Sequence, residues 1–243
     1  MHRKKSRFRV TAIGLTSLLT LFLASFPELV LAREANTLQE PNTPRQGLPG
    51  RRIGGGTRGD CNFGEKTLTA LIPQKNLGLT VAANPTLLFF VPQTSGSQVV
   101  EFVLNDETDD LVYETTFNTT GTSGVISLSV PDSTPLKIGK KYHWYVSIIC
   151  DPQDRAQDIS VDGWIQRVEA NPTLASKLEK VAPLERAALY AASDIWYEAL
   201  TTLAKLRQSR PNDPTIAAEW AKLLQSVGLD NIAQEPLATS QKR

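Results

Sequence analysis

The residues most able to do chemistry in this sequence fall in two neighbouring segments. His143 and Tyr145 stand two positions apart, and so do Asp162 and Trp164 further along the chain. An imidazole and a carboxylate can transfer protons, and aromatic rings offer flat surfaces to a ligand. If the two segments lie side by side, these four side chains form a candidate site for catalysis or binding.

Adjacent strands would bring the four residues together. The segments 142–150 and 158–168 both alternate apolar and polar residues, which is typical of strands with one buried face. An antiparallel hairpin can keep the apolar side chains of both strands on the core face. That register pairs Val146 with Val161, Ile148 with Ile159 and Trp144 with Gly163, where the indole covers the glycine. The opposite face then carries His143, Tyr145, Asp162 and Trp164.

Two interpretations of this face stay open. It is a small binding patch for a sugar or a protein, or the helical segment that follows in the sequence packs over it. The second is favoured because exposed apolar patches on monomers are usually small. A lone histidine on a strand is more often structural than catalytic, and the sequence specifies no proton-transfer partner for His143.

Metal and nucleotide sites are poorly supported. Two aspartate runs, 106–110 and 151–158, lack the every-second-position spacing and the glycine turn of a calcium loop. Two distant cysteines and His143, the one histidine beyond residue 32, do not make a closed zinc set. Gly54, Gly56 and Gly59 match a dinucleotide fingerprint, but no strand precedes them and no helix follows. We therefore expect no metal and no cofactor.

The N-terminal residues have the pattern of a cleavable signal peptide. A basic stretch is followed by an apolar run from Val10 to Phe26 and by small residues that end at Ala32. The run is slightly short for a membrane span and ends at Pro27, which favours cleavage over anchoring. Removing residues 1–32 leaves 21 basic and 24 acidic side chains, a net charge of −3. An exported, mildly acidic protein has no electrostatic footprint for nucleic acid.

The two cysteines predict one disulfide. Cys61 and Cys150 are the only cysteines in the chain, and oxidising compartments outside the cytoplasm allow the bond to form. Two free buried thiols are the alternative. A bond across this loop would stabilise the fold by roughly 4–5 kcal/mol in the entropy model.

After the leader, the chain divides into four parts. Residues 33–60 are rich in glycine, proline and arginine and are expected to be a flexible linker. The fold class predicted for the protein is α+β. Residues 61–169 are expected to form a β-sandwich of the immunoglobulin or fibronectin type III kind. Its expected strands are 67–72, 87–91, 98–105, 111–117, 125–130, 142–150 and 158–168. Residues 170–235 are expected to be helical, and 236–243 a disordered tail.

The helical part resembles tetratricopeptide repeats. Ala187, Tyr190, Ala199 and Pro211 match one 34-residue unit over 180–213, although Pro183 and Arg186 depart from the pattern. A second, partial unit begins near Pro214. One and a half repeats are too few for a separate solenoid, so we expect these helices to pack on the sandwich. The resemblance implies protein binding, and a plain helical cap is the alternative.

A second resemblance covers most of the chain. Distinctive runs are found at 50–61 (GRRIGGGTRGDC), 68–73 (LTALIP), 142–144 (YHW), 148–152 (IICDP), 163–165 (GWI), 196–200 (WYEAL) and 223–229 (LLQSVGL). Together they resemble a cyanobacterial family known as domain of unknown function 928. The resemblance implies an exported protein and carries over no activity, substrate or catalytic residue.

Taken together, the sequence predicts a non-enzymatic interaction protein that is periplasmic or secreted and binds a protein partner. The alternative is a cell-envelope hydrolase or carbohydrate-binding protein that uses the face with His143, Tyr145, Asp162 and Trp164.

Overall fold

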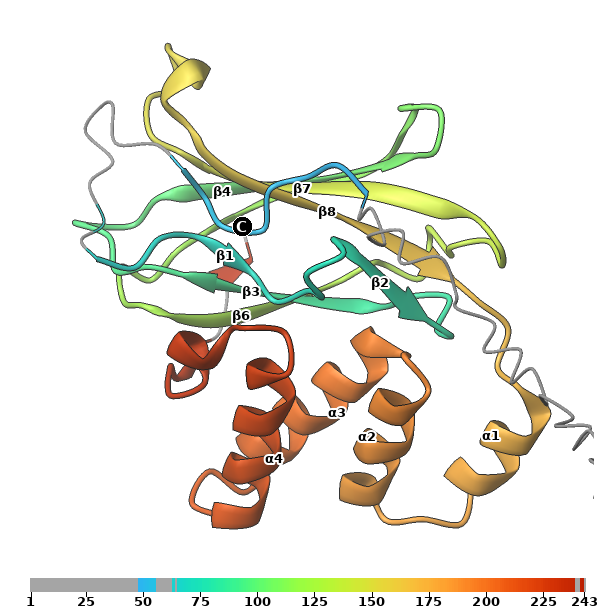
Figure 1. Cartoon of the computed structure of the whole chain (residues 1–243). Helices are drawn as coiled ribbons and strands as arrows, with labels where there is room; N and C mark the ends of the chain where they lie inside the picture. Colours follow the sequence, from blue (N-terminus) through green and yellow to red (C-terminus); the bar gives the residue numbers. More distant parts are fainter. Residues whose placement is uncertain (1–47, 56–62, 64, 239–240, 243) are drawn as a thin grey trace, which may run out of the picture. The chain divides into compact units, whose positions relative to one another are not determined.

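The computed structural model of the chain describes residues 48–55, 63, 65–238 and 241–242. They form two packed β-sheets followed by four α-helices (Figure 1). The strands are β1 (Thr69–Ala70), β2 (Leu77–Thr80), β3 (Thr86–Val91), β4 (Val99–Asp106), β5 (Leu111–Asn118), β6 (Gly124–Ser129), β7 (Lys141–Ile149), β8 (Ile159–Arg167), β9 (Leu237–Ala238) and β10 (Gln241–Lys242). The helices are α1 (Pro172–Leu178), α2 (Pro183–Ala192), α3 (Trp196–Ser209) and α4 (Pro214–Gln225).

The two sheets are mixed. One has the strand order β1-β3-β6-β9, and the other has the order β10-β5-β4-β7-β8-β2. The pairs β2–β8 and β6–β9 are parallel, whereas the remaining pairs are antiparallel. The predicted sandwich-like packing of two sheets is therefore confirmed.

Each of the seven expected strands overlaps a strand of the structure. The sequence analysis missed β2, β9 and β10. All three are short, and β2 contains Gly78, so local alternation is too brief to indicate a strand. Their pairing depends instead on partners that are distant in the sequence.

The predicted register of β7 and β8 is confirmed. Val146 pairs with Val161, Ile148 with Ile159 and Trp144 with Gly163. A Cβ atom on Gly163 would lie 2.6 Å from Cζ2 of Trp144, so the indole occupies the space above the glycine. The inward-facing Trp144, Val146 and Ile148 are buried, as burial of one strand face requires.

The helix boundaries follow local capping chemistry. Asn171 caps α1 and Asp213 caps α4, each accepting a hydrogen bond from a first-turn N–H group. Proline occupies the first turn of α1, α2 and α4. The chain after α4 turns at Gly228, whose φ is +71°. All four helices lie within residues 170–235, which the sequence predicts to be helical.

Helix α3 joins the helices to the sandwich. Its Tyr197 is buried, and the phenol oxygen accepts a hydrogen bond from Trp144 Nε1 at 3.1 Å inside the sheets. Trp196 Nε1 donates to the carbonyl of Leu71 at 2.8 Å. The helices lie together beside the sheet that contains β1, β3 and β6 (Figure 1), and one continuous hydrophobic core includes both parts. The expectation that the helices pack on the sandwich is confirmed.

Part of the predicted linker pairs with both sheets. The backbone of Arg51 exchanges hydrogen bonds with Asp162 of β8, and that of Arg52 accepts one from Ala70 of β1. Ile53 forms a β-bridge with Thr69. Residues 48–55 thus lie along the seam between β1 and β8 instead of forming a free tether, because the sheet edges satisfy their backbone groups. The remainder of the linker falls outside the described residues.

The C-terminal residues also differ from the expected disordered tail. Leu237–Ala238 extend the first sheet beside β6, and Gln241–Lys242 extend the second sheet beside β5. Both short strands therefore form sheet edges, opposite β1 in the first sheet and β2 in the second.

Two predictions concern residues that the structure does not describe. The leader, 1–32, lies outside the described residues, and so does Cys61. The disulfide between Cys61 and Cys150 therefore stays a prediction. Within the described part of the chain, no helix has the length and apolar character needed to cross a membrane.

Candidate functional site

The four candidate residues lie side by side on the outer face of β7 and β8. His143 is opposite Trp164 and Tyr145 is opposite Asp162 in the register of the two strands. All four side chains are partly buried. The β-hairpin therefore assembles the cluster that the alternation of the sequence predicted.

Hydrogen bonds connect three of these residues in a chain. His143 Nε2 lies 2.7 Å from Asp162 Oδ2, and Tyr145 Oη lies 2.7 Å from His143 Nδ1. An ionised carboxylate can only accept, so His143 Nε2 donates to Asp162. In a neutral imidazole Nδ1 accepts from the phenol of Tyr145, and in an imidazolium it donates to the phenol oxygen. Both nitrogens of His143 are consequently used within the protein.

Ring contacts hold the imidazole further. His143 stacks on Trp164 with centroids 4.2 Å apart and an interplanar angle of 13°. It also packs on Tyr145 with the same centroid distance and a tilt of 40°. The histidine side chain is only 12 % exposed. These contacts fix its orientation but leave little of it open to a ligand.

The cluster also binds the segment that precedes β1. Asp162 Oδ1 accepts the backbone N–H of Arg51 at 2.7 Å, and Trp164 Nε1 donates to the carbonyl of Pro49 at 2.9 Å. Gly50 lies between them with φ near +153°, and a Cβ atom there would be 2.7 Å from Asp162 Oδ2. The expectation that the helical segment packs over this face is wrong, because the helices lie beside the sheet that contains β1, β3 and β6 (Figure 1). The covering of this face thus comes from residues 49–51, which sequence reasoning assigned to a linker.

The electrostatics fit a hydrogen-bonding role for Tyr145. Burial raises the pKa of Tyr145, and the negative charges of Asp109 and Asp162 raise it further. The phenol therefore keeps its proton at neutral pH.

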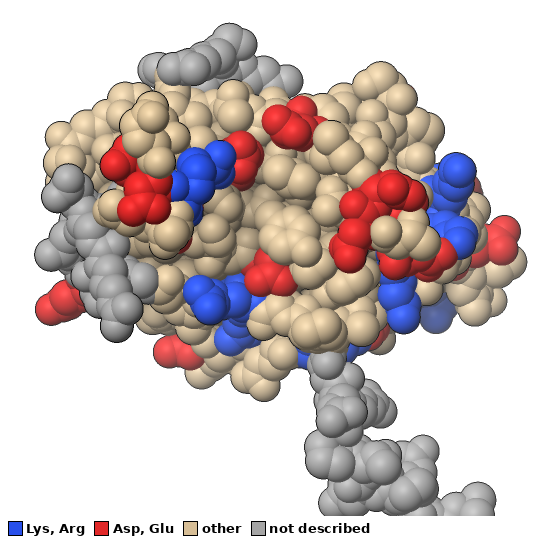
Figure 2. Space-filling view, turned by 90° about the horizontal axis from the view of Figure 1, so that it is seen from above, with Lys and Arg blue, Asp and Glu red and all other residues tan. Residues whose placement is uncertain are grey.

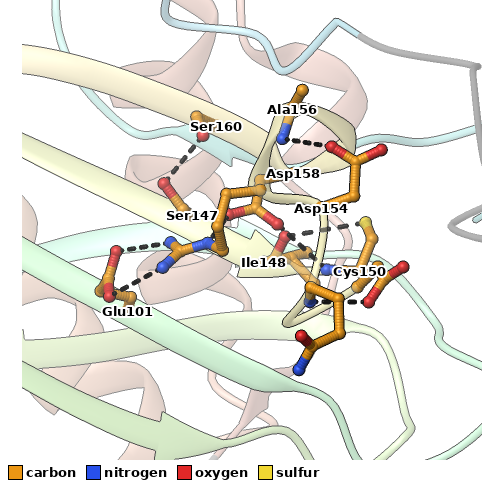
Figure 3. Close-up of polar contacts among 11 residues, drawn as sticks. Glu101, Ser147, Ile148, Cys150, Asp154, Ala156, Asp158 and Ser160 are labelled. Atoms are coloured by element: carbon orange, nitrogen blue, oxygen red, sulfur yellow. Dashed lines mark hydrogen bonds and ion pairs between the residues drawn. The ribbon is translucent and has the colours of Figure 1, made fainter.

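The same sheet face continues into a polar network around Arg155. Its guanidinium bonds to Glu101 Oε2 at 2.7 Å and to Asp158, and these contacts raise the pKa of Arg155. Ser147 and Ser160 form a cross-strand hydrogen bond of 2.8 Å beside this network (Figure 3). Figure 2 shows the carboxylates in separate clusters with basic side chains beside several of them.

The two aspartate runs serve as turn caps. Asp106 accepts from the backbone N–H groups of Thr108 and Asp110, and Asp154 accepts from that of Ala156. Asp151 accepts from the N–H of Gln153 in the same way. These oxygens are satisfied by their own loops, and the described residues contain no group of three or more potential metal ligands.

An apolar groove lies elsewhere, between α2 and α4 with α3 as its floor. Its volume is about 450 Å³. Its walls are mostly alanine and aliphatic side chains, with Asp194, Glu219 and Lys222 among its polar residues; the apolar lining residues are Pro73, Leu184, Ala187, Ala188, Ala191, Trp196, Leu203, Leu223 and Val227. Figure 1 shows α2 and α4 on either side of α3.

Comparison with known families decides the family of the chain. The family described as Domain of Unknown Function (DUF928) matches residues 53–237. The chain belongs to the DUF928 family. The DUF928 region contains both sheets up to β9 and all four helices, so it includes the cluster and the groove. A search of curated proteins found no match.

Two features of this DUF928 chain were not predicted from the sequence: the groove between α2 and α4, and the binding of residues 49–51 to Asp162 and Trp164. Small residues at 187, 188 and 191 of α2 were a signal for the groove, because alanines in a helix face leave space beside a neighbouring helix. The bound segment gave no local signal. Its backbone pairs with sheet edges that are far away in the sequence.

Proposed function

We propose that this protein is an extracytoplasmic binding protein that takes up an apolar segment of a partner polypeptide in the groove between α2 and α4. The observation that carries the proposal is the apolar lining of that open groove. Ala188 and Ala191 are exposed within it, and the surrounding Leu203 and Leu223 are packed into the core. Rigid apolar walls that stay open to solvent are typical of a helix-in-groove binding site.

The arrangement of α2 and α3 supports this proposal. The two helices pack as neighbours after a short turn at 193–195, and the small residues Ala187 and Ala199 are buried. A tetratricopeptide unit places small residues at such helix contacts, so that grooves form between successive units. We infer a tetratricopeptide-like role for α2, α3 and α4, namely protein binding.

The sandwich has a feature of immunoglobulin-type folds that supports the finer fold assignment. Tyr142, at the start of β7, accepts a hydrogen bond of 3.0 Å at its phenol oxygen from the backbone N–H of Lys137. A tyrosine that bonds back to the chain a few residues upstream is the tyrosine corner of those sandwiches. We infer an immunoglobulin-like or fibronectin type III-like origin for this part, in which the sandwich acts as scaffold.

The cluster around His143 supports the hydrolase alternative less well. A general base must reach the substrate or a nucleophile that faces it, whereas the His143 side chain is only 12 % exposed and is stacked on Trp164. Asp162 and Trp164 also hold residues 49–51. We propose that this face is structural and that the protein is not an enzyme.

Site-specific photo-crosslinking tests the proposed function. A photoreactive phenylalanine analogue at Ala188 should form discrete adducts with a polypeptide from envelope extracts of the cells that produce the protein. The same analogue at Ala217, which is exposed on α4 and does not line the groove, is the matched control. Equal adducts at both positions, or none at Ala188, would contradict the proposal.

A further inference from the structure

The outer edge of β5 is unusually open. The strand contains eight residues, and on the side away from β4 only Phe117 and Asn118 are paired by described residues, through β10. Leu111 is 61 % exposed, and β5 contains neither lysine nor proline. Proteins normally shorten, charge or cover such edges because unpaired backbone groups recruit other strands. Within residues 112–116, Glu114 is the one charged side chain that discourages pairing with another strand.

A groove runs beside this edge. Its volume is about 170 Å³, and β5 and β6 form its walls at the seam between the two sheets. The lining residues are Tyr113, Thr115, Thr116, Phe117, Ser127, Leu128 and Ser129. Side chains that alternate along an added strand would therefore point in turn into this groove and toward the outer sheet face.

The protein's own chain already uses both edges of the seam. β9 pairs in parallel with Val125 and Ile126 of β6, and β10 pairs antiparallel with Phe117 and Asn118 of β5. An extended segment therefore fits beside β5. An antiparallel strand over residues 112–116 would continue the ladder that β10 begins.

The charge of this end of the sheet indicates the kind of segment. Glu114 is exposed on β5, and the β4–β5 loop adds Asp106, Glu107, Asp109 and Asp110. Among the described residues, the one ion pair in that group joins Glu107 to Lys140. Lys137, Lys140 and Lys141 lie beside that loop and offset its charge. Glu114 itself forms no ion pair with a described residue, so a basic side chain opposite it on the added strand would be its partner.

We propose that β5 is a strand-addition site for an extended, basic segment of a partner polypeptide, paired antiparallel with residues 112–116. The segment carries lysine or arginine opposite Glu114 and small or β-branched apolar residues toward Tyr113 and Thr115. Main-chain hydrogen bonds supply affinity, and alternate side chains supply selectivity. This site is separate from the groove between α2 and α4.

A second copy of the chain fits the edge less well than a single strand. In a two-fold antiparallel pairing centred on Glu114, two carboxylates would lie directly opposite each other, which is unfavourable. A second sandwich would also present a broad sheet edge, whereas the space between β5 and β6 is a narrow groove. A single extended segment satisfies both restrictions.

Binding of a capped synthetic peptide to the mature protein tests the site. The probe alternates valine with lysine and threonine, and two derivatives carry N-methyl groups on alternate sets of residues. Strand pairing uses the N–H groups on one side only. One derivative should therefore lose at least about tenfold in affinity while the other binds like the parent peptide.

Variants and the position of binding complete the test. Glu114→Lys should weaken binding about threefold, as expected for an exposed charge pair, while Glu185→Lys on α2 is the matched control and leaves it unchanged. NMR amide shifts should concentrate in residues 112–116. Equal binding of both methylated peptides, or no binding of the parent, would overturn the proposal. So would a dimer in sedimentation that Glu114→Lys dissociates, because the edge would then serve a second copy.

Discussion

At the scale of single residues, Asp162 connects two parts of the chain. One carboxylate oxygen accepts from His143 Nε2 and the other from the backbone N–H of Arg51. The first contact orders the outer face of the hairpin, and the second holds the segment before β1. The carboxylate is therefore an anchor for residues that close the seam of the sandwich.

Replacing this carboxylate should destabilise the fold without changing its architecture. We expect Asp162→Ala to lower the free energy of unfolding by about 1–3 kcal/mol, because two partly buried donors lose their acceptor. Urea denaturation measures the effect, with the exposed Asp132→Ala as control. Equal losses in the two variants would show that the anchoring contacts contribute nothing.

Glu198 is a second residue whose role depends on its surroundings. On α3, its Oε1 accepts from the Thr80 hydroxyl at 2.6 Å and from the N–H groups of Val81 and Ala82. Burial raises the pKa of Glu198, although these hydrogen bonds oppose the shift. The folded protein therefore binds this proton more tightly than the unfolded chain does.

The pH dependence of stability should report this residue. A raised folded pKa contributes stability that is fully present below the unfolded pKa of about 4.3 and is lost as pH rises through the folded pKa. We expect the unfolding free energy of the wild-type protein to lose this contribution as the pH rises through the folded pKa of Glu198. The Glu198→Gln variant should show no such pH-dependent loss. Denaturation series from pH 4 to 7 compare the two proteins, and parallel curves would contradict the prediction.

Local alternation was sufficient to predict the candidate site at this scale. The inward positions 144, 146 and 148 fixed the register, and the register placed His143 beside Trp164. The alternation contained no information on Pro49 or Arg51. Their contacts with Trp164 and Asp162 depend on chain folding across more than a hundred positions.

At the scale of elements, α3 can pack closely on β2 because Gly78 of β2 has no side chain at the contact. A Cβ atom on Gly78 would lie 2.5 Å from the Tyr197 ring. The glycine therefore allows α3 to approach the strand and Tyr197 to reach Trp144. The glycine that weakened the strand pattern in the sequence is the residue that admits the helix.

Filling this space should separate the two elements. We expect Gly78→Ala to cost about 1–3 kcal/mol, because the added methyl group forces the ring or the strand to move. Gly96→Ala is the control, since a Cβ atom there meets nothing within 4 Å. Thermal unfolding of both variants checks the prediction. A Gly78→Ala protein as stable as the control would show that the contact adjusts freely.

Elements with strong local signals were predictable, and those defined by distant partners were not. The caps of α1 and α4 use Asn171 and Asp213 with a following proline, so both helix starts followed from neighbouring residues. β9 has two residues, and only its pairing with β6 makes it a strand. No window of the sequence around Leu237 contains that partner.

At the scale of the whole described molecule, sandwich and helices share one hydrophobic core. Trp144 belongs to the sandwich, yet its indole nitrogen is satisfied by Tyr197 of α3. Leu71 of the sandwich likewise accepts from Trp196. Separating the parts would expose apolar surface and leave buried polar groups unpaired.

The sandwich should therefore not fold without the helices. We expect a chain that stops at residue 170 to lack a cooperative unfolding transition and near-ultraviolet circular dichroism, whereas the full-length protein shows a single transition in both. A truncated chain that unfolds cooperatively at a similar denaturant concentration would contradict this. Calorimetry and circular dichroism make the comparison.

The insertion of α3 also sets an order of events during synthesis. A ribosome releases the sheet residues first, but Trp196 and Tyr197 emerge only after every strand from β1 to β8 has left. Until then Trp144 Nε1 and the carbonyl of Leu71 lack the partners that α3 supplies. The two tryptophan and tyrosine hydrogen bonds that join α3 to the sandwich can therefore form only after about four-fifths of the chain has been synthesised.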